Sequence, residues 1–191
     1  MKQQLPHLQI SRLCKARPEA VYDLLADLKS HLVWAGARQT QDFHLVSLEA
    51  PPGPAAVGTS FSSTGVIPMS RRRWSDRSTV SIADRPLKFE ITTHATAGDR
   101  NAMTAVYRHA YEISPATRGS LVTYTLTQLS ITNPMLRWAI PGMRRMTWLM
   151  VPMYAGRGLR NLIALAEERD LATQAGSRRP LSPAVGYTQE K

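Results

Sequence analysis

Residues 87–92, with the sequence LKFEIT, decide the fold class of this chain. Leu87, Phe89 and Ile91 alternate with charged or polar residues, so every second side chain is apolar. A period of two is typical of a β-strand that buries one face and exposes the other. Residues 84–86, Asp-Arg-Pro, precede the segment as a turn signal, so it is predicted to be a separate strand with Leu87 pointing inward.

Further strand candidates flank this segment, and clusters of Gly, Pro, Asp and Asn divide them. No helical pattern separates consecutive strands after residue 43, so an antiparallel meander is expected. Together with residues 87–92 there are about seven strands. The other candidates cover residues 8–14, 43–48, 58–66, 74–82, 103–113 and 121–129.

Two short helices are predicted after the first strand. Pro18 suits the first position of a helix, and apolar residues with helical spacing follow it up to Leu28. Residues 30–34 suggest a second short helix capped by Ser30. Carboxylates at every fourth position of the first helix are read as a solvated face rather than a metal site, because no histidine joins them. They are Glu19, Asp23 and Asp27.

The chain changes character after Asn133-Pro134. Residues 135 to about 172 have helical spacing with an apolar stripe, and Pro152 is expected to kink this helix or start its second half. From residue 173 onward Gln, Gly, Ser, Arg and Pro dominate. We therefore predict a single domain over residues 1–172 and a flexible tail over residues 173–191.

Composition narrows the class of protein. Of 191 residues 43% are hydrophobic and 20% charged, which suits a globular core. Cys14 is the only cysteine, residues 1–6 have no apolar signal region, and no long uncharged apolar run occurs, so a cytoplasmic protein is expected. The five histidines show no paired ligand spacing, and nucleotide-binding and hydrolase motifs are missing. Neither a metal nor a cofactor is therefore predicted.

The charge is strongly and unevenly basic. The chain has 24 Lys and Arg residues against 14 Asp and Glu residues, and no carboxylate lies between Glu112 and Glu167. Such a surface attracts an anionic partner, either a membrane surface or an acidic ligand more than nucleic acid, or it is a solubilising excess of charge. Residues 131–153, rich in Met, Trp and Arg, are interpreted either as a membrane-surface helix or as a pliable wall of a cavity.

Several short motifs follow one another between residues 8 and 170. They are ARPEAVYDLLAD at 16–27, VGTSF at 57–61, DRPLKF at 84–89, YEISP and GSLVT between 111 and 123, and GLRNL and AE between 158 and 167. In this order they resemble the START/Bet v 1-like superfamily, also called SRPBCC, which includes polyketide cyclase/dehydrase-like proteins. The chain departs from the family pattern at 84–89, which is one residue shorter, and at Ser120, where threonine is usual.

The resemblance implies an α+β helix-grip fold, in which a curved antiparallel sheet surrounds a long C-terminal helix and an apolar cavity. It also implies binding of a hydrophobic small molecule, polyketide- or lipid-like. The first alternative is an enzyme of the cyclase, aromatase or dehydratase type that needs no metal. The second is an interaction module for anionic membrane or nucleic acid. The family has no universal catalytic residue, so the site must be argued from this chain.

Strand alternation selects the residues that would face such a cavity. His109 and Asp76 are the catalytic candidates, because both can exchange protons near neutral pH in an apolar site. The alternatives are a core histidine bonded to Tyr107 or to the backbone, and an Asp76 paired with Arg73 or Arg77. The predicted ligand-binding residues are Trp34, Phe61, Trp74, Phe89, Met103, Tyr107, Tyr111, Tyr124 and Trp148.

Overall fold

The computed structural model describes residues 7–39, 44–66, 73–97, 103–132 and 140–177, and in the last range the side chains of residues 152 and 154–175. Seven strands and four helical elements follow one another. The order is β1 (His7–Cys14), α1 (Pro18–Ala26), η1 (Leu28–Ser30), η2 (Leu32–Ala37), β2 (His44–Glu49), β3 (Ser60–Val66), β4 (Arg73–Asp84), β5 (Lys88–Ala97), β6 (Met103–Ala116), β7 (Gly119–Thr132) and α2 (Ile140–Ser177).

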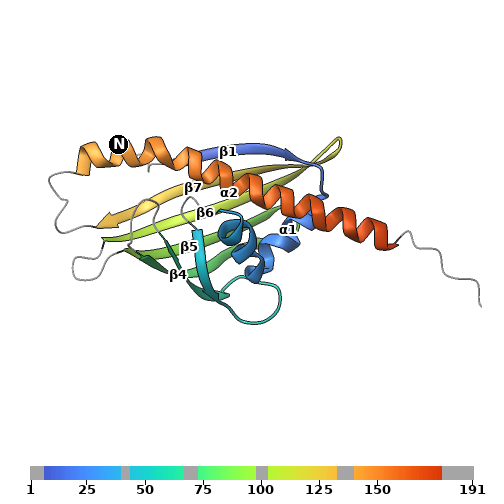
Figure 1. The fold of residues 1–191 in the computed structure, drawn as a ribbon, viewed down its shortest axis with the longest axis horizontal. Coiled ribbons are helices and arrows are strands. Elements are labelled where there is room, and N and C mark those ends of the chain that lie inside the picture. The colour runs from blue at the N-terminus through green and yellow to red at the C-terminus, as the bar shows by residue number, and fades with distance from the viewer. Residues whose placement is uncertain (1–6, 40–43, 67–72, 98–102, 133–139, 178–191) are drawn as a thin grey trace, which may run out of the picture.

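The strands form one antiparallel sheet in the order β1-β7-β6-β5-β4-β3-β2. Consecutive strands pair from β2 to β7, which confirms the meander, and β1 closes the sheet against β7. Figure 1 shows the sheet curving behind α2, which runs along β1 and reaches α1. A seven-stranded antiparallel sheet with a long C-terminal helix fits the α+β helix-grip fold expected from the sequence.

Helix α2 is continuous from Ile140 to Ser177 and contains Pro152 in its interior. It continues through residues 173–177, which are predicted above as the start of the tail. Residues 135–139, where the helix is predicted to begin, lie outside the described residues. Residues 178–191, the remainder of that predicted tail, lie outside the described residues. Within the described residues, no helix is apolar over enough of its length to span a bilayer.

The region after α1 differs from the single capped helix that was predicted. Ser30 does not cap a helix start: its hydroxyl donates to the carbonyl of Leu24 at 2.7 Å. His31 reaches the carbonyl of Leu25 at 2.9 Å through Nε2. The last carbonyls of a helix have no partner within it, so these two buried side chains satisfy the end of α1.

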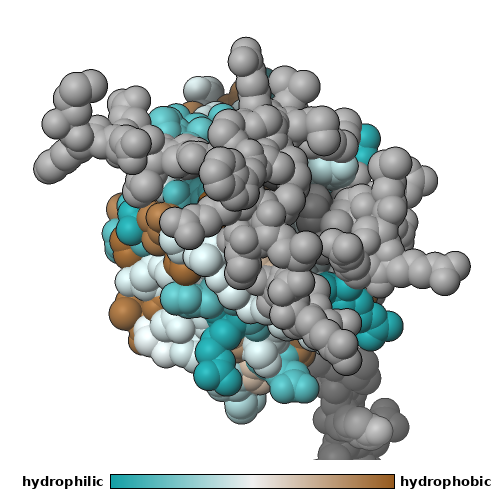
Figure 2. Space-filling model, turned by 90° about the vertical axis from the view of Figure 1, so that its left-hand side faces the viewer, coloured by the Kyte–Doolittle hydropathy of each residue, from teal (hydrophilic) through white to brown (hydrophobic). Residues whose placement is uncertain are grey.

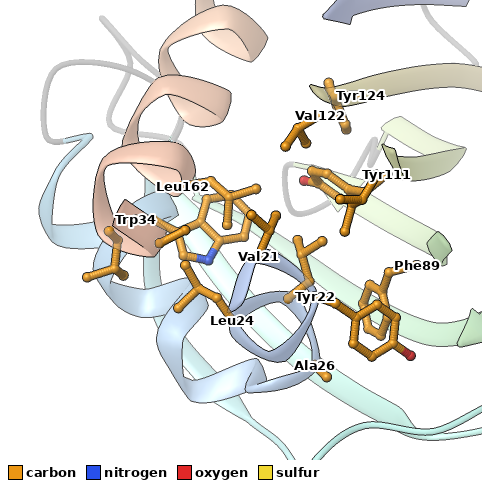
Figure 3. Packing of buried hydrophobic residues seen from close by; sticks show 14 of the residues in the cluster. Val21, Tyr22, Leu24, Ala26, Trp34, Phe89, Tyr111, Val122, Tyr124 and Leu162 are labelled. Atoms are coloured by element: carbon orange, nitrogen blue, oxygen red, sulfur yellow. The ribbon is translucent and has the colours of Figure 1, made fainter. Parts of the chain in front are cut away.

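The hydrophobic core fills one end of the sheet. Figure 3 shows Leu162 of α2 beside Trp34 of η2 and Val21 of α1, with Tyr22 reaching Phe89. These side chains are at most 6% exposed, so this end has little free volume.

Ion pairs hold the helices around this core. Arg17 binds the buried carboxylate of Asp170 in α2 at 2.8 Å. Asp23 and Asp27, which we had read as a solvated face, pair at the surface with Arg85 and Arg169.

Candidate functional site

A cavity of about 650 Å³ lies between the concave face of the sheet, the η1–η2 region and α2. Apolar and aromatic side chains dominate its described lining. Helix α2 closes it with Tyr154, Ala155, Gly158 and Leu159.

Small residues explain why this end of the sheet is open while the other is filled. The strand pairings place Asp76 opposite Ser63 and Ala95, and Ala95 opposite Ala105. The next row toward the strand ends contains Gly65, Trp74 and Ala97. This floor of glycine and alanine leaves space that leucine or phenylalanine would fill.

Gly65 is required by the indole ring of Trp74. A Cβ atom at Gly65 would lie 2.5 Å from Cε2 of Trp74 and 2.5 Å from the carbonyl oxygen of His44. The absence of a side chain at Gly65 therefore lets the indole lie against β3, so the ring forms a wall of the cavity.

Most of the predicted ligand-binding residues come together in this cavity. Phe89 does not line it: it is fully buried and packs edge-to-face on Tyr22, with 5.9 Å between ring centroids. The side chain of Trp148 lies outside the described residues. Those that line the cavity are Trp34, Phe61, Trp74, Met103, Tyr107, Tyr111 and Tyr124.

Leu87, expected to point inward, is 49% exposed. The strand begins one residue later, at Lys88, and Leu87 belongs to the turn in which its amide donates to the carbonyl of Asp84 at 2.7 Å. The alternation that identified the strand therefore extends one residue too far.

His109 lines the cavity and its Nδ1 lies 2.8 Å from the hydroxyl of Tyr124. The partner is thus Tyr124 of the neighbouring strand, and neither Tyr107 nor a backbone carbonyl. Burial, and to a smaller extent the nearby His31, lowers the pKa of His109 to about 4. The imidazole is therefore neutral at pH 7 and serves as a hydrogen-bonding group or as a weak base.

His31 also lines the cavity, although the sequence analysis did not select it. Its pKa is lowered to about 4 by burial, against the opposing effect of its bond to the Leu25 carbonyl. The ring centroids of His31 and Trp34 are 4.8 Å apart. A spacing of three residues between them is the only signal that could have placed His31 on the same inner face.

Asp76 lines the cavity with little hydrogen bonding. Ser63 donates to Oδ2 over a long 3.4 Å, and Oδ1 is buried without a partner. Arg73 and Arg77 are exposed and alternate with Asp76 along β4, so the proposed ion pair with either is not observed. Burial raises the pKa of Asp76 to about 7, despite the Ser63 hydrogen bond.

His109 and Asp76 occupy different positions along the cavity. His109 pairs with Ile91, which pairs with Val80, whereas Asp76 lies four residues earlier on β4. Four residues along a strand and two strand spacings separate their Cα atoms by about 16 Å on a flat sheet. They cannot exchange a proton directly, although one ligand can contact both.

The titration of the two buried imidazoles gives a first prediction. NMR of the ring carbons should show His31 and His109 neutral down to about pH 5, because burial lowers both pKa values to about 4. In urea, both should titrate near the ordinary value of about 6.5. A midpoint near 6.5 for either residue in the folded protein would show that water reaches its ring.

Exposed apolar side chains and arginines are scattered over the described surface rather than clustered. Exposed apolar side chains such as Leu13, Val57 and Leu171 lie on different elements, and Figure 2 shows hydrophobic residues interspersed with hydrophilic ones on the coloured part of one face. Arg118 is in the β6–β7 turn and Arg160 on α2. The side chains of Arg137, Arg144 and Arg145 lie outside the described residues.

Comparisons with solved structures identify proteins of the same fold. A conserved protein from Geobacillus kaustophilus aligns with a TM-score of 0.61 and 12% identity, over 85% of this chain and 94% of its own. A Mesorhizobium loti protein aligns with a TM-score of 0.59 and 12% identity, over 86% and 99%. One from Chromobacterium violaceum gives 0.57 and 16%, over 84% and 97%. No family model and no curated protein matches the chain. At these identities the likeness concerns the fold alone.

Proposed function

We propose that this protein binds a hydrophobic small molecule, polyketide- or lipid-like, in the cavity between its sheet and α2. The observation that carries the proposal is the cavity itself, about 650 Å³, whose described lining includes seven Phe, Trp and Tyr rings and a floor of alanines. Ligand sites are typically about 300–1,000 Å³ and mostly apolar, with a few polar groups that fix orientation. Here those groups are Asp76 and the His109–Tyr124 pair.

We also propose that the chain belongs to the START/Bet v 1-like (SRPBCC) superfamily. The support is the order of its sequence motifs together with the antiparallel sheet and long C-terminal helix. The motif GSLVT begins at Gly119, whose φ of +99° favours glycine, so the structure gives a reason for the first residue of this motif.

Native mass spectrometry of the purified protein tests the binding proposal directly. A retained hydrophobic molecule, released on denaturation and identified after extraction, is the expected result. A protein that remains empty, and whose mass is unchanged by added lipids and aromatic polyketide analogues, would contradict it.

Filling the cavity should abolish binding. Ala105→Phe introduces a ring at a cavity-lining position that is 3% exposed, whereas Thr104→Phe places the same ring on the exposed face of the same strand. We expect at least tenfold weaker binding of any identified ligand for Ala105→Phe and no change for Thr104→Phe. Circular dichroism tests whether both variants fold. If Ala105→Phe does not fold, Ala95→Leu replaces it as a smaller side chain that also fills the cavity. Equal affinity in all variants would place the ligand elsewhere.

An enzyme of the cyclase, aromatase or dehydratase type is the second candidate. One observation favours it: a carboxyl group in an apolar cavity that ionises near neutral pH, as a general base or acid requires. His109 is the weaker candidate of the two for proton transfer, because a pKa of about 4 makes its imidazole a weak base and its Nδ1 is already bonded to Tyr124. With an identified substrate, Asp76→Asn would abolish turnover and retain binding if this candidate is correct.

A further inference from the structure

The cavity has a charge character opposite to that of the whole protein. The chain carries a formal net charge of +10, yet no Lys or Arg is among the described residues that line the cavity. Asp76 is the only carboxyl group there. The other titratable groups facing it or sharing the cavity are His31 before η2, Tyr154 of α2, and Tyr107, His109, Tyr111 and Tyr124 of the sheet.

Asp76 has no counter-ion within the described part of the protein. Ser63 donates one long hydrogen bond to Oδ2, and Oδ1 has no partner within the described residues. Burying a carboxylate is strongly unfavourable unless a positive charge or several hydrogen-bond donors compensate it. The nearby aromatic rings do not donate to it: the indole Nε1 of Trp74 is also without a partner.

The surroundings of Asp76 suit a cation with an apolar body. Trp74 is the preceding inward residue on β4, and Tyr107 lies one row farther along the sheet. Burial raises the pKa of Tyr107, and the charge of Asp76 raises it further. Electron-rich ring faces attract an ammonium group, and Ala95 and Ala105 leave room for it beside the carboxylate.

We infer that the ligand is a hydrophobic amine whose ammonium group pairs with Asp76 and whose apolar body lies along the alanine floor toward Tyr107 and His109. This inference rests on the proposed binding function and adds the chemical class of the ligand. A neutral hydroxyl group also donates to a carboxylate, but it does not supply the positive charge that the described lining lacks.

Three pyrene probes of nearly equal size distinguish these cases: 1-pyrenemethylamine, 1-pyrenemethanol and 1-methylpyrene. Quenching of tryptophan fluorescence measures their binding. At pH 8 we expect the amine to bind at least tenfold more tightly than the alcohol. Asp76→Asn should remove this preference, whereas Glu49→Gln, which deletes one exposed charge outside the cavity, should keep it.

The pH dependence of the native protein provides an independent measurement that needs no variant. Because Asp76 ionises with a pKa of about 7, its charged fraction rises about tenfold between pH 6 and 8 while an alkylammonium group stays protonated. Amine affinity should rise about tenfold over this range, and methylpyrene affinity should not change.

The possible outcomes separate the inference from the function it rests on. Amine and alcohol binding equally at pH 8, or an amine preference that survives Asp76→Asn, would overturn the amine inference and leave the binding function intact. If none of the three probes binds and native mass spectrometry finds no ligand, the binding function itself fails.

Discussion

Asp76→Asn is expected to raise the free energy of unfolding at pH 8 by on the order of 2–4 kcal/mol, and to change it little at pH 4. The folded-state pKa of Asp76 is about 7, raised from an ordinary value of 3.8. Between these two pH values the folded protein retains a proton that the unfolded chain has released. Stability contributed by this group therefore falls as the pH rises from about 4 to 7 and is level above it. Asparagine keeps the shape and never carries the charge.

Urea unfolding of the native protein and of Asp76→Asn at several pH values measures this effect. The difference between the two proteins is the informative quantity, because His31 and His109 act in the opposite direction. Their pKa values of about 4 lie below the ordinary 6.5, so their contribution is present above pH 6.5 and is lost as the pH falls toward 4. Glu49→Gln should show no comparable dependence. A difference that stays constant from pH 4 to pH 8 would contradict the buried, uncompensated state of Asp76.

If Asp76→Asn stabilises the protein and also removes its preference for the amine, the two results have one cause. A buried carboxylate without a counter-ion lowers the free energy of unfolding of the empty protein. The same carboxylate strengthens the binding of a cationic ligand, because the ligand supplies the missing charge. Functional sites commonly retain such unfavourable groups, because the function needs them. Removing such a group stabilises the fold and weakens binding.

The sheet could be predicted because period-two alternation reports directly on strands with one buried face. Alternation around Phe89 and Ile91 gave the correct strand, and on β6 it placed Tyr107 and His109 on the inner face. Alternation does not tell whether an inward residue meets a cavity or the core. Phe89 and Ile91 share a face, but only Ile91 lines the cavity, because α1 brings Tyr22 onto Phe89.

The hydrogen-bond partner of His109 on the neighbouring strand could not be predicted from alternation either. His109 lies directly opposite Leu126, and its bond to Tyr124 is diagonal across the β6–β7 pair. Such a contact requires the register, which a bulge after Val106 shifts. Strict alternation on β4 explains why neither Arg73 nor Arg77 pairs with Asp76, because both lie on the opposite face of the strand.

Helix ends were the least predictable elements. Ser30 was assigned as a cap from residue type alone, yet it turns back to the carbonyl of Leu24. The run from Leu32 to Ala37 has wider turns than an α-helix, which no period of 3.6 would reveal. His31 was missed as a consequence, because its inward direction depends on this geometry.

Gly119→Ala is expected to destabilise the protein by roughly 3 kcal/mol or more, among the largest effects of any single methyl group in this chain. Gly119 has a φ of +99°, which residues with a side chain rarely adopt. A Cβ atom there would overlap the carbonyl oxygen of Cys14 and lie 2.6 Å from the carbonyl carbon of Lys15. Both obstacles are backbone, and pairing of Cys14 with Ser120 prevents them from moving away cheaply.

Gly53→Ala is the matched control, because Gly53 has a φ of +90° but no atom within 4 Å of an added Cβ. It should lose only the conformational term, about 1–2 kcal/mol. The difference between the two variants in urea unfolding then measures the close approach of the β6–β7 hairpin to the end of β1. This close approach would explain why glycine begins the GSLVT motif. The following residue, Ser120, also ties the hairpin to this segment, because its hydroxyl donates to the carbonyl of Ala16 at 3.1 Å. Equal losses in both variants would show that the strand end yields, and that the motif needs glycine for its backbone angle alone.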